Sequence, residues 1–277
     1  MSEQDAKATV QAASDWWKTE IIDIRPGEIA VRGYDIQDLI GKISFPDMIW
    51  LMTRGDLPTV EQARLLEAAL VASVDHGPHA PSIAIASMAA TCGIGLNNAM
   101  ASAINVLGDT HGGAGQDCMV LYELVRSKLD KGMDLPAAAD EALAETVAAN
   151  GKIIPGFGHR FHPVDPRAAP LLGMVEAAAA KGEVGGGYVA IGREVEAGIL
   201  RRTGKPIPMN IDGATAVIFC ELGFAPPMGR GLFILSRSVG ILAHAWEQIK
   251  VDRRMKGPMP KGIPFTYAGP AKRKLDR

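Results

Sequence analysis

Hydrophobic residues along this chain recur mostly at the spacing of a helix with one buried face. The clearest early stripe has apolar residues three or four positions apart: Ala63, Leu66, Leu70 and Val74. Such spacing places side chains on one side of a helix. Thr59 is a suitable N-cap for this helix, with Gln62 in the capping-box position. The same pattern predicts further helices over residues 35–41, 44–54, 116–131, 136–149, 167–181 and 187–203.

A long helix is predicted from about Gly229 to Arg253. Its apolar residues repeat at three and four and are expected to form a buried face: Leu232, Leu235, Val239, Leu242, Trp246 and Ile249. Arg237 and His244 fall on another face of this helix. The tail from Met255 onward contains four prolines, and we expect it to run extended over a surface, such as that of a second subunit.

Two stretches depart from this pattern. Short apolar runs around Arg25-Pro26-Gly27, within residues 20–33, predict a small hairpin. Residues 80–108 carry no charged side chain, but their polar residues and glycines are too frequent for a segment that crosses a bilayer. We expect two buried helices there, broken at Gly93-Ile94-Gly95. The predicted fold class is therefore all-α.

Composition narrows the class of protein. The chain has 277 residues, of which 47% are hydrophobic and 22% charged, as in soluble globular proteins. A formal net charge of -2 argues against nucleic acid or an anionic membrane as the main partner. The cysteines form no disulfide framework and no metal-ligand pattern, and we expect them to be buried: Cys92, Cys118 and Cys220. The N-terminus lacks the order of a secretory signal, so the expected location is the cytoplasm.

The stretch from Ile153 to Leu172 reads IIPGFGHRFHPVDPRAAPLL and is typical of a site. Its glycines fix the backbone before His159 and let it approach a ligand closely. Asp165 as N-cap and Pro166 at the first helical position predict a helix start, with Arg167 in the first turn. An imidazole beside a guanidinium suits a substrate that carries a carboxylate. The alternative is a capped helix with an exposed arginine and a loop histidine of structural role.

Two more glycine-flanked junctions carry candidate groups: His111 in the segment 109–115 and Asp212 in the segment 210–213. Helices supply Arg167 and Arg237. Two histidines, a carboxylate and two arginines can make or break a carbon–carbon bond next to a thioester, since they can move a proton, stabilise an enolate and hold carboxylates. No cluster of histidines and carboxylates has the spacing of metal ligands, so no metal is expected.

The order of these motifs resembles that of the citrate synthase superfamily over nearly the whole chain. The matching segments are Arg32-Gly33-Tyr34-Asp35-Ile36 with Gly55-Asp56-Leu57-Pro58, His111-Gly112-Gly113-Ala114, PGFGHR to DPR (155–167), Asn210-Ile211-Asp212, and residues 236–248. This resemblance implies an all-helical homodimer with a large domain, residues 1–111 and 213–277, and a small domain, residues 112–212. The small domain would close over oxaloacetate and an acyl-CoA.

The resemblance also implies roles for individual residues. His111 would stabilise the thioester enolate, Asp212 would exchange the methyl proton, and His159 would bond to the ketone or alcohol oxygen. The dicarboxylate would be held by four side chains: His76, Arg167, Arg237 and Phe233. The CoA adenine would lie along the backbone of Ile154, Pro155, Gly156, Phe157 and Gly158. Coenzyme A thioester is thus a substrate, and no tightly bound cofactor is implied.

Structural roles remain open for several of these residues. His76 is also suited to finish a helix, because histidine near a C-terminus matches the helix dipole. Asp212 is also suited to cap the helix that follows it. Arg237 is also suited to a buried structural ion pair. We expect His162 and His244 to support the site without touching the substrate.

Departures from the synthase pattern indicate which branch of the family the chain resembles. After Asp212 stands Gly213, where synthases usually have phenylalanine, and the Asp-Gly pair resembles citryl-CoA lyases and the lyase module of ATP-citrate lyase. The arginine that synthases send into the partner subunit has three candidates here: Arg253, Arg254 and Lys256. We expect citryl-CoA lyase-like cleavage to acetyl-CoA and oxaloacetate. Condensation as in citrate or methylcitrate synthase, or a non-catalytic binding regulator, are the alternatives.

Overall fold

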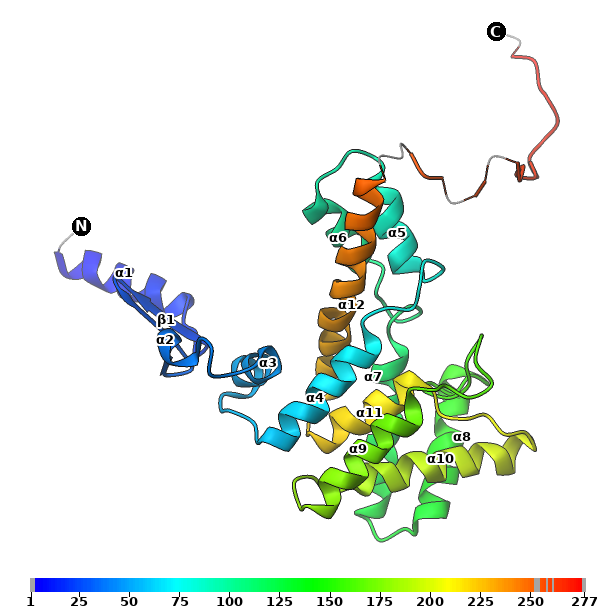
Figure 1. The fold of residues 1–277 in the computed structure, drawn as a ribbon, viewed down its shortest axis with the longest axis horizontal. Coiled ribbons are helices and arrows are strands. Elements are labelled where there is room, and N and C mark those ends of the chain that lie inside the picture. Colours follow the sequence, from blue (N-terminus) through cyan, green and yellow to red (C-terminus); the bar gives the residue numbers. More distant parts are fainter. Residues whose placement is uncertain (1–2, 252–254, 258, 261, 276–277) are drawn as a thin grey trace. The chain divides into compact units, whose positions relative to one another are not determined.

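The computed structural model describes residues 3–251, 255–257, 259–260 and 262–275, and these are mainly helical (Figure 1). The chain divides into two compact units. The first contains Met1–Ala72 and Gly115–Gly229, and the second contains Ser73–Ala114 and Arg230–Arg277. The all-α fold class is confirmed. The division into a large domain and a small closing domain stays a prediction.

The first unit begins with helix α1 (Glu3–Trp16), which the sequence pattern did not predict, and a small antiparallel sheet. The sheet pairs β1 (Ile22–Arg25) with β2 (Glu28–Val31), and β2 with β3 (Tyr34–Asp35). The predicted hairpin is therefore confirmed, with a third short strand added to it. Helix α2 (Ile36–Leu39) follows the sheet directly.

Two capping boxes fix the next helices. In α3 (Phe45–Arg54), the N-cap Ser44 and Asp47 exchange hydrogen bonds. In α4 (Val60–Ser73), Thr59 and Gln62 exchange the same pair, as predicted. The buried face of α4 is centred on Leu65, Leu66, Ala69 and Ser73, and the predicted stripe residues Ala63, Leu70 and Val74 are half-buried beside it.

The rest of the first unit is a helical body built around one buried helix. It contains α7 (Ala114–Leu129), α8 (Leu135–Asn150), α9 (Ala168–Ala180), α10 (Gly187–Thr203) and α11 (Ile211–Glu221). Helix α10 packs on α8 and α11, and α11 also packs on α9. Every residue of α11 from Gly213 to Cys220 is buried. A helix that is apolar on all sides belongs in a core, so Asp212 lies at the entry of the most enclosed helix of this unit.

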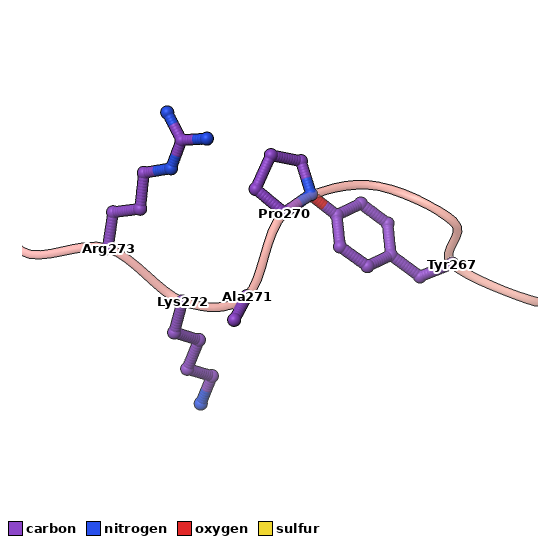
Figure 2. Close-up of a pocket in the computed structure, with 5 residues that line it drawn as sticks. All are labelled: Tyr267, Pro270, Ala271, Lys272 and Arg273. Carbon is purple, nitrogen blue, oxygen red and sulfur yellow. The ribbon is translucent and has the colours of Figure 1, made fainter.

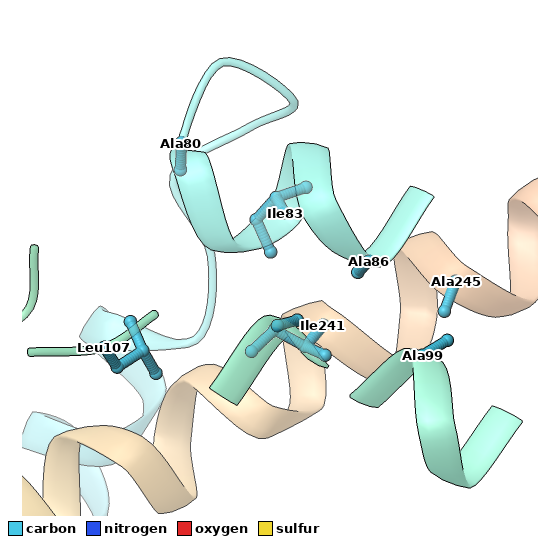
Figure 3. Packing of buried hydrophobic residues seen from close by; sticks show 8 residues of the cluster. Ala80, Ile83, Ala86, Ala99, Leu107, Ile241 and Ala245 are labelled. Atoms are coloured by element: carbon cyan, nitrogen blue, oxygen red, sulfur yellow. The ribbon is translucent and has the colours of Figure 1, made fainter. Parts of the chain in front are cut away.

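The second unit consists of α5 (Pro81–Ala90), α6 (Leu96–Ile104) and most of α12 (Pro226–Lys250). Figure 3 shows their core, in which Ile83 and Ile241 pack among alanines. Small side chains let these helix backbones approach closely. The predicted break at Gly93-Ile94-Gly95 is confirmed. No helix in the described part of the chain is long and apolar enough to cross a membrane.

The predicted buried face of the last helix is mostly wrong. Only Leu232 is buried; the rest of the stripe is exposed by 38% to 58% of each side chain: Leu235, Val239, Leu242, Trp246 and Ile249. The side that packs inside the unit carries smaller and more polar residues: Ser236, Arg237, Gly240, Ile241, Ala245 and Gln248. Spacing identifies an apolar face, but it does not identify what covers that face.

The C-terminal tail returns to α5, where the backbone N–H groups of Met255 and Lys256 donate to the Thr91 carbonyl and hydroxyl oxygens. Arg253 and Arg254, two of the candidates for a residue that reaches a partner, lie outside the described residues. Figure 2 shows a shallow hollow farther along, between Tyr267 and Arg273. It is formed by neighbouring residues of one extended segment and includes none of the predicted site residues. Cys118 and Cys220 are buried as expected, whereas Cys92 is exposed.

Candidate active site

In the first unit, the glycine-rich loop before His159 is hydrogen-bonded to the segment that leads into α11. The Gly158 N–H donates to the Pro208 carbonyl at 2.8 Å, and the Asn210 N–H donates to the Gly156 carbonyl at 2.9 Å. Gly156 has a φ of +84°, and a Cβ there would meet the Sγ of Cys118. A Cβ on Gly213 would lie 2.5 Å from the Gly156 carbonyl oxygen. Only glycine at both positions permits this approach.

Asn210 connects the two segments that carry His159 and Asp212. Its Oδ1 caps α11 by accepting from the N–H groups of Asp212 (2.9 Å) and Gly213 (3.3 Å). Its Nδ2 donates to the Gly158 carbonyl at 2.6 Å. The alternative that Asp212 is the N-cap is therefore wrong, because Asn210 occupies that position. Asp212 lies half-buried in the first turn, where the helix dipole favours a carboxylate.

The loop around His159 fixes its ring. Nδ1 accepts hydrogen bonds from the backbone N–H groups of Phe161 and His162, both at 3.1 Å. A neutral ring held in this way carries its proton on Nε2. Burial lowers the pKa of His159, and the neighbouring His162 and Arg167 act in the same direction, against Asp165. His159 is thus presented as a neutral hydrogen-bond donor.

Arg167 is held by Asp165. The Nε and Nη2 of Arg167 donate to the two carboxylate oxygens at 2.9 and 2.8 Å, and Oδ2 also accepts from the Ile211 N–H at 2.9 Å. Burial opposes ionisation of Asp165, but these bonds lower its pKa to about 2. The predicted helix start is wrong by two residues: α9 begins at Ala168, with Arg167 at the N-cap position. The Asp165 carboxylate binds the guanidinium and α11, besides accepting from the Arg167 N–H at 3.1 Å.

In the second unit, His111 is held at the N-terminus of α5. Its Nε2 accepts from the Ser82 N–H at 3.2 Å and lies 3.0 Å from the Ser82 hydroxyl. Burial and the positive charge of Arg237 lower the pKa of His111. The ring is therefore held neutral, with its proton on Nδ1. This is the opposite tautomer to that of His159.

Arg237 and Phe233 lie on α12 in the same unit as His111. Arg237 is buried, its guanidinium lies 4.9 Å from the centre of the Phe233 ring, and its Nε donates to the Ser73 carbonyl at 3.2 Å. Stacking on the Phe233 ring and the bond to Ser73 hold the guanidinium of Arg237 in place. That Arg237 and Phe233 hold a dicarboxylate stays a prediction.

His76 lies on a short segment that packs against α12. Asp75 accepts from the Gly77 N–H at 3.1 Å and contacts the His244 Nε2 at 3.3 Å. Helix α4 ends at Ser73, so His76 does not form its last turn. The alternative of a helix-terminating histidine is therefore not supported. That His244, which contacts Asp75, supports the site without touching the substrate stays a prediction.

Each unit thus assembles part of the predicted set. The first holds His159, Arg167, Asp212 and the loop of Ile154, Pro155, Gly156, Phe157 and Gly158, and the second holds His76, His111, Phe233 and Arg237. That all of them act on one ligand stays a prediction. Among the described residues, no group of three or more histidines, cysteines and carboxylates is placed to hold a metal ion.

Sequence reasoning missed three supporting residues. Asn210 and Asp165 stood inside recognised motifs, but a motif does not show that a cap also bonds the neighbouring loop, or that a carboxylate joins an arginine to another helix. Ser82 is 29 positions from His111, and no local pattern connects them. Only the path of the backbone brings that N–H to the imidazole.

Comparison with known proteins identifies relatives over most of the chain. The family described as "Citrate synthase, C-terminal domain" matches residues 59–258. The citrate synthase of Deinococcus radiodurans is 30% identical over 230 residues, which cover 82% of this chain and 58% of the relative. The citrate synthase of Acidithiobacillus ferridurans is 30% identical over 214 residues, 75% of this chain and 52% of the relative. The chain thus spans little more than half of these relatives.

A solved structure matches at nearly full length. The citryl-CoA lyase from Hydrogenobacter thermophilus has a TM-score of 0.81 and 32% sequence identity, and the match covers 94% of this chain and 97% of that one. A citrate synthase from Thermoplasma acidophilum, solved with carboxymethyl coenzyme A and oxaloacetate, has a TM-score of 0.67 and 27% identity, over 84% of this chain and 59% of that one. The family resemblance inferred from the motifs is confirmed.

Proposed function

Because the chain belongs to the citrate synthase family, we propose that it cleaves a citryl-CoA-type thioester reversibly to acetyl-CoA and oxaloacetate. The observation that carries this proposal is the likeness to citryl-CoA lyase at 32% identity over 97% of that protein. The relatives named citrate synthase share less than two thirds of their length with this chain. Gly213, packed against the Gly156 carbonyl, supports the same branch of the family.

His111 stabilises the enolate in this proposal. When the carbon–carbon bond breaks, its electron pair moves onto the acetyl fragment and charge develops on the thioester oxygen. The Nδ1–H of His111 donates to that oxygen, because the Ser82 N–H holds the lone pair of Nε2. A neutral imidazole keeps its proton and donates a hydrogen bond to the enolate oxygen.

Asp212 and His159 handle the two protons. In cleavage, protonated Asp212 gives its proton to the enolate carbon, and the hydroxyl proton of the adduct passes to His159. The hydrogen bonds on the Nδ1 of His159 favour a proton on Nε2, which suits donation to the ketone oxygen in the reverse, condensing direction. Accepting the hydroxyl proton at Nε2 requires the other neutral tautomer of His159, with the ring proton on Nδ1 in place of the two backbone hydrogen bonds. The imidazolium formed in this step then releases one proton to water, and the Asp212 carboxylate takes one up before the next turnover. The two bonds to Nδ1 therefore favour condensation, as in a citrate synthase, as the second candidate.

Arg167, Arg237 and His76 bind the carboxylates of oxaloacetate, and Phe233 packs beside them. Arg167 retains donors for a substrate because its described bonds, to Asp165 through Nε and Nη2 and to the Ala72 carbonyl through Nη1, use three of the five N–H groups of a guanidinium. The backbone from Ile154 to Gly158 holds the CoA adenine, and its hydrogen bonds to residues 208 and 210 keep it rigid. Coenzyme A enters as part of the substrate.

The proposal includes a homodimer. Support comes from the exposed stripe on α12, where five large apolar residues lie at spacings of four and three: Leu235, Val239, Leu242, Trp246 and Ile249. A row of exposed apolar side chains on a single chain marks a surface that binds another protein. It is the seam that a second helix covers in a two-helix packing.

The test is to supply the protein with the substrates of the cleavage direction and, separately, with those of the condensing direction. With citryl-CoA we expect oxaloacetate to form, detected by NADH oxidation with added malate dehydrogenase, without release of free thiol. With acetyl-CoA and oxaloacetate, rapid thiol release would replace the lyase proposal by the synthase alternative. The variants H111A and D212A are the controls. Unchanged turnover in both would favour a non-catalytic CoA-binding regulator.

A further inference from the structure

Asp165 is buried and bonded on both oxygens. It is 2% exposed, and its carboxylate accepts four hydrogen bonds. Three come from Arg167, through its backbone N–H, Nε and Nη2. The fourth comes from the backbone N–H of Ile211, the residue immediately before Asp212. One oxygen, Oδ2, accepts from both the guanidinium and α11, at 2.8 and 2.9 Å.

We propose that Asp165 is a positioning residue that couples binding of the dicarboxylate at Arg167 to the placement of Asp212. This inference rests on the proposed function. A substrate carboxylate that binds the outer edge of the Arg167 guanidinium competes with Asp165 for the positive charge of that group. This competition shifts the plane of the guanidinium. Because Nη2 and the Ile211 N–H share Oδ2, any shift of the guanidinium changes the bond that holds the first turn of α11. Asp212 lies in that turn.

Two features favour coupling over simple structural support. The Ile211 N–H is one of the donors that a helix leaves unsatisfied at its N-terminus, and here a buried carboxylate accepts it in place of water. Asp165 also carries its negative charge next to a helix N-terminus, which strengthens that bond. An ion pair with only a stabilising role needs no contact with the helix that bears the catalytic acid.

The experiment measures exchange of the acetyl-CoA methyl protons with D₂O, with and without (S)-malate as an unreactive dicarboxylate. Exchange needs Asp212 and His111 but no carbon–carbon bond formation. Coupling between sites typically changes an equilibrium about 5- to 150-fold, so we expect malate at saturation to accelerate exchange by the wild-type protein about tenfold. In D165N, whose side chain has the same shape but no charge, we expect the ratio of the two rates to fall close to one.

D140N is the matched control. Asp140 pairs with Arg201 at 2.9 Å in the same unit, between α8 and α10, and has no contact with α11 among those described. We expect its malate ratio to equal that of the wild type. Should D165N not fold, D165E is measured in its place. Its carboxylate is displaced by one methylene, so we expect the ratio of the exchange rates with and without malate to be lower than in the wild type.

The outcomes separate the two proposals. If D165N lowers both rates by the same factor and keeps the wild-type ratio, Asp165 is merely structural and the coupling is disproved. The same conclusion follows if D165E, tested in its place, keeps the full ratio. If the wild-type protein exchanges no methyl protons under either condition, the proposed function itself fails, and the coupling fails with it.

Discussion

Asn210 donates from its Nδ2 to the carbonyl of Gly158 at 2.6 Å while its Oδ1 caps the helix that carries Asp212. One side chain therefore sets the position of the residue before His159 and that of Asp212. The chemistry proposed for these two groups needs them at fixed places, since small displacements cost large factors in rate.

The two hydrogen-bonding roles of the Asn210 side chain can be tested with two variants. N210D keeps the acceptor that caps α11 but loses the donor to Gly158, and N210A loses both. A lost N-cap typically costs about 0.5–2 kcal/mol, so we expect N210A to lower the free energy of unfolding by about 1 kcal/mol and N210D by less. Both variants should lower kcat, because each loses the bond to the Gly158 carbonyl, and in N210D the new carboxylate also repels that carbonyl. Wild-type turnover in N210D would show that this link has no catalytic role.

The proton positions on the two histidines are a second prediction. We expect ¹⁵N NMR to show neutral His111 with its proton on Nδ1 and neutral His159 with its proton on Nε2, because backbone N–H groups occupy the opposite nitrogens. H111Q and H159Q assign the signals. The same tautomer on both rings would contradict the described hydrogen bonds.

The lowered pKa of His111 makes stability depend on pH in a defined direction. Folding favours the neutral ring, so this contribution is fully present above about pH 6.5, the ordinary histidine value, and is lost as pH falls through the lower pKa of the folded state. Urea unfolding of the wild type and H111Q between pH 7.5 and 5 should show a steeper loss in the wild type. R237M should raise the pKa of His111, since it removes a nearby cation. Parallel pH profiles would rule out this contribution.

Gly213 and Gly156 leave no room for an added methyl group. A Cβ on Gly213 would lie 2.5 Å from the Gly156 carbonyl oxygen and 2.6 Å from the Met209 Cγ. Overpacking of this kind costs about 1–3 kcal/mol, and we expect G213A to lower the melting temperature and to raise KM for the thioester. The control is G173A on α9, where a Cβ meets nothing within 4 Å. Replacing that helical glycine should stabilise by about 0.5–1 kcal/mol.

The exposed stripe on α12 predicts how the proposed dimer is broken. V239E places a charge in the middle of the stripe, where Val239 is 58% exposed, and we expect light scattering to show a monomer. V71E, at a valine of α4 that is 64% exposed and outside the stripe, should leave the dimer intact. A V239E protein that remains dimeric would assign the interface to another surface.

The sequence predicted the helical architecture well because its signals are local. Capping residues such as Thr59 and glycine breaks such as Gly93 lie next to the elements they limit. The motifs led to His111, His159 and Asp212 through family resemblance. What failed depended on contacts between distant residues. Asp165 was read as a cap because its bond to Ile211 spans 46 positions, and the α12 stripe was read as core because spacing does not reveal what covers a face.

The donor that fixes the tautomer of neutral His111 is the backbone N–H of Ser82. Every amino acid except proline supplies that group, so a substitution at position 82 can keep the backbone bond to Nε2 even where it loses the hydroxyl contact. Comparison of sequences alone will therefore undervalue this position. The choice of which His111 nitrogen carries the proton is thus encoded in the path of the main chain.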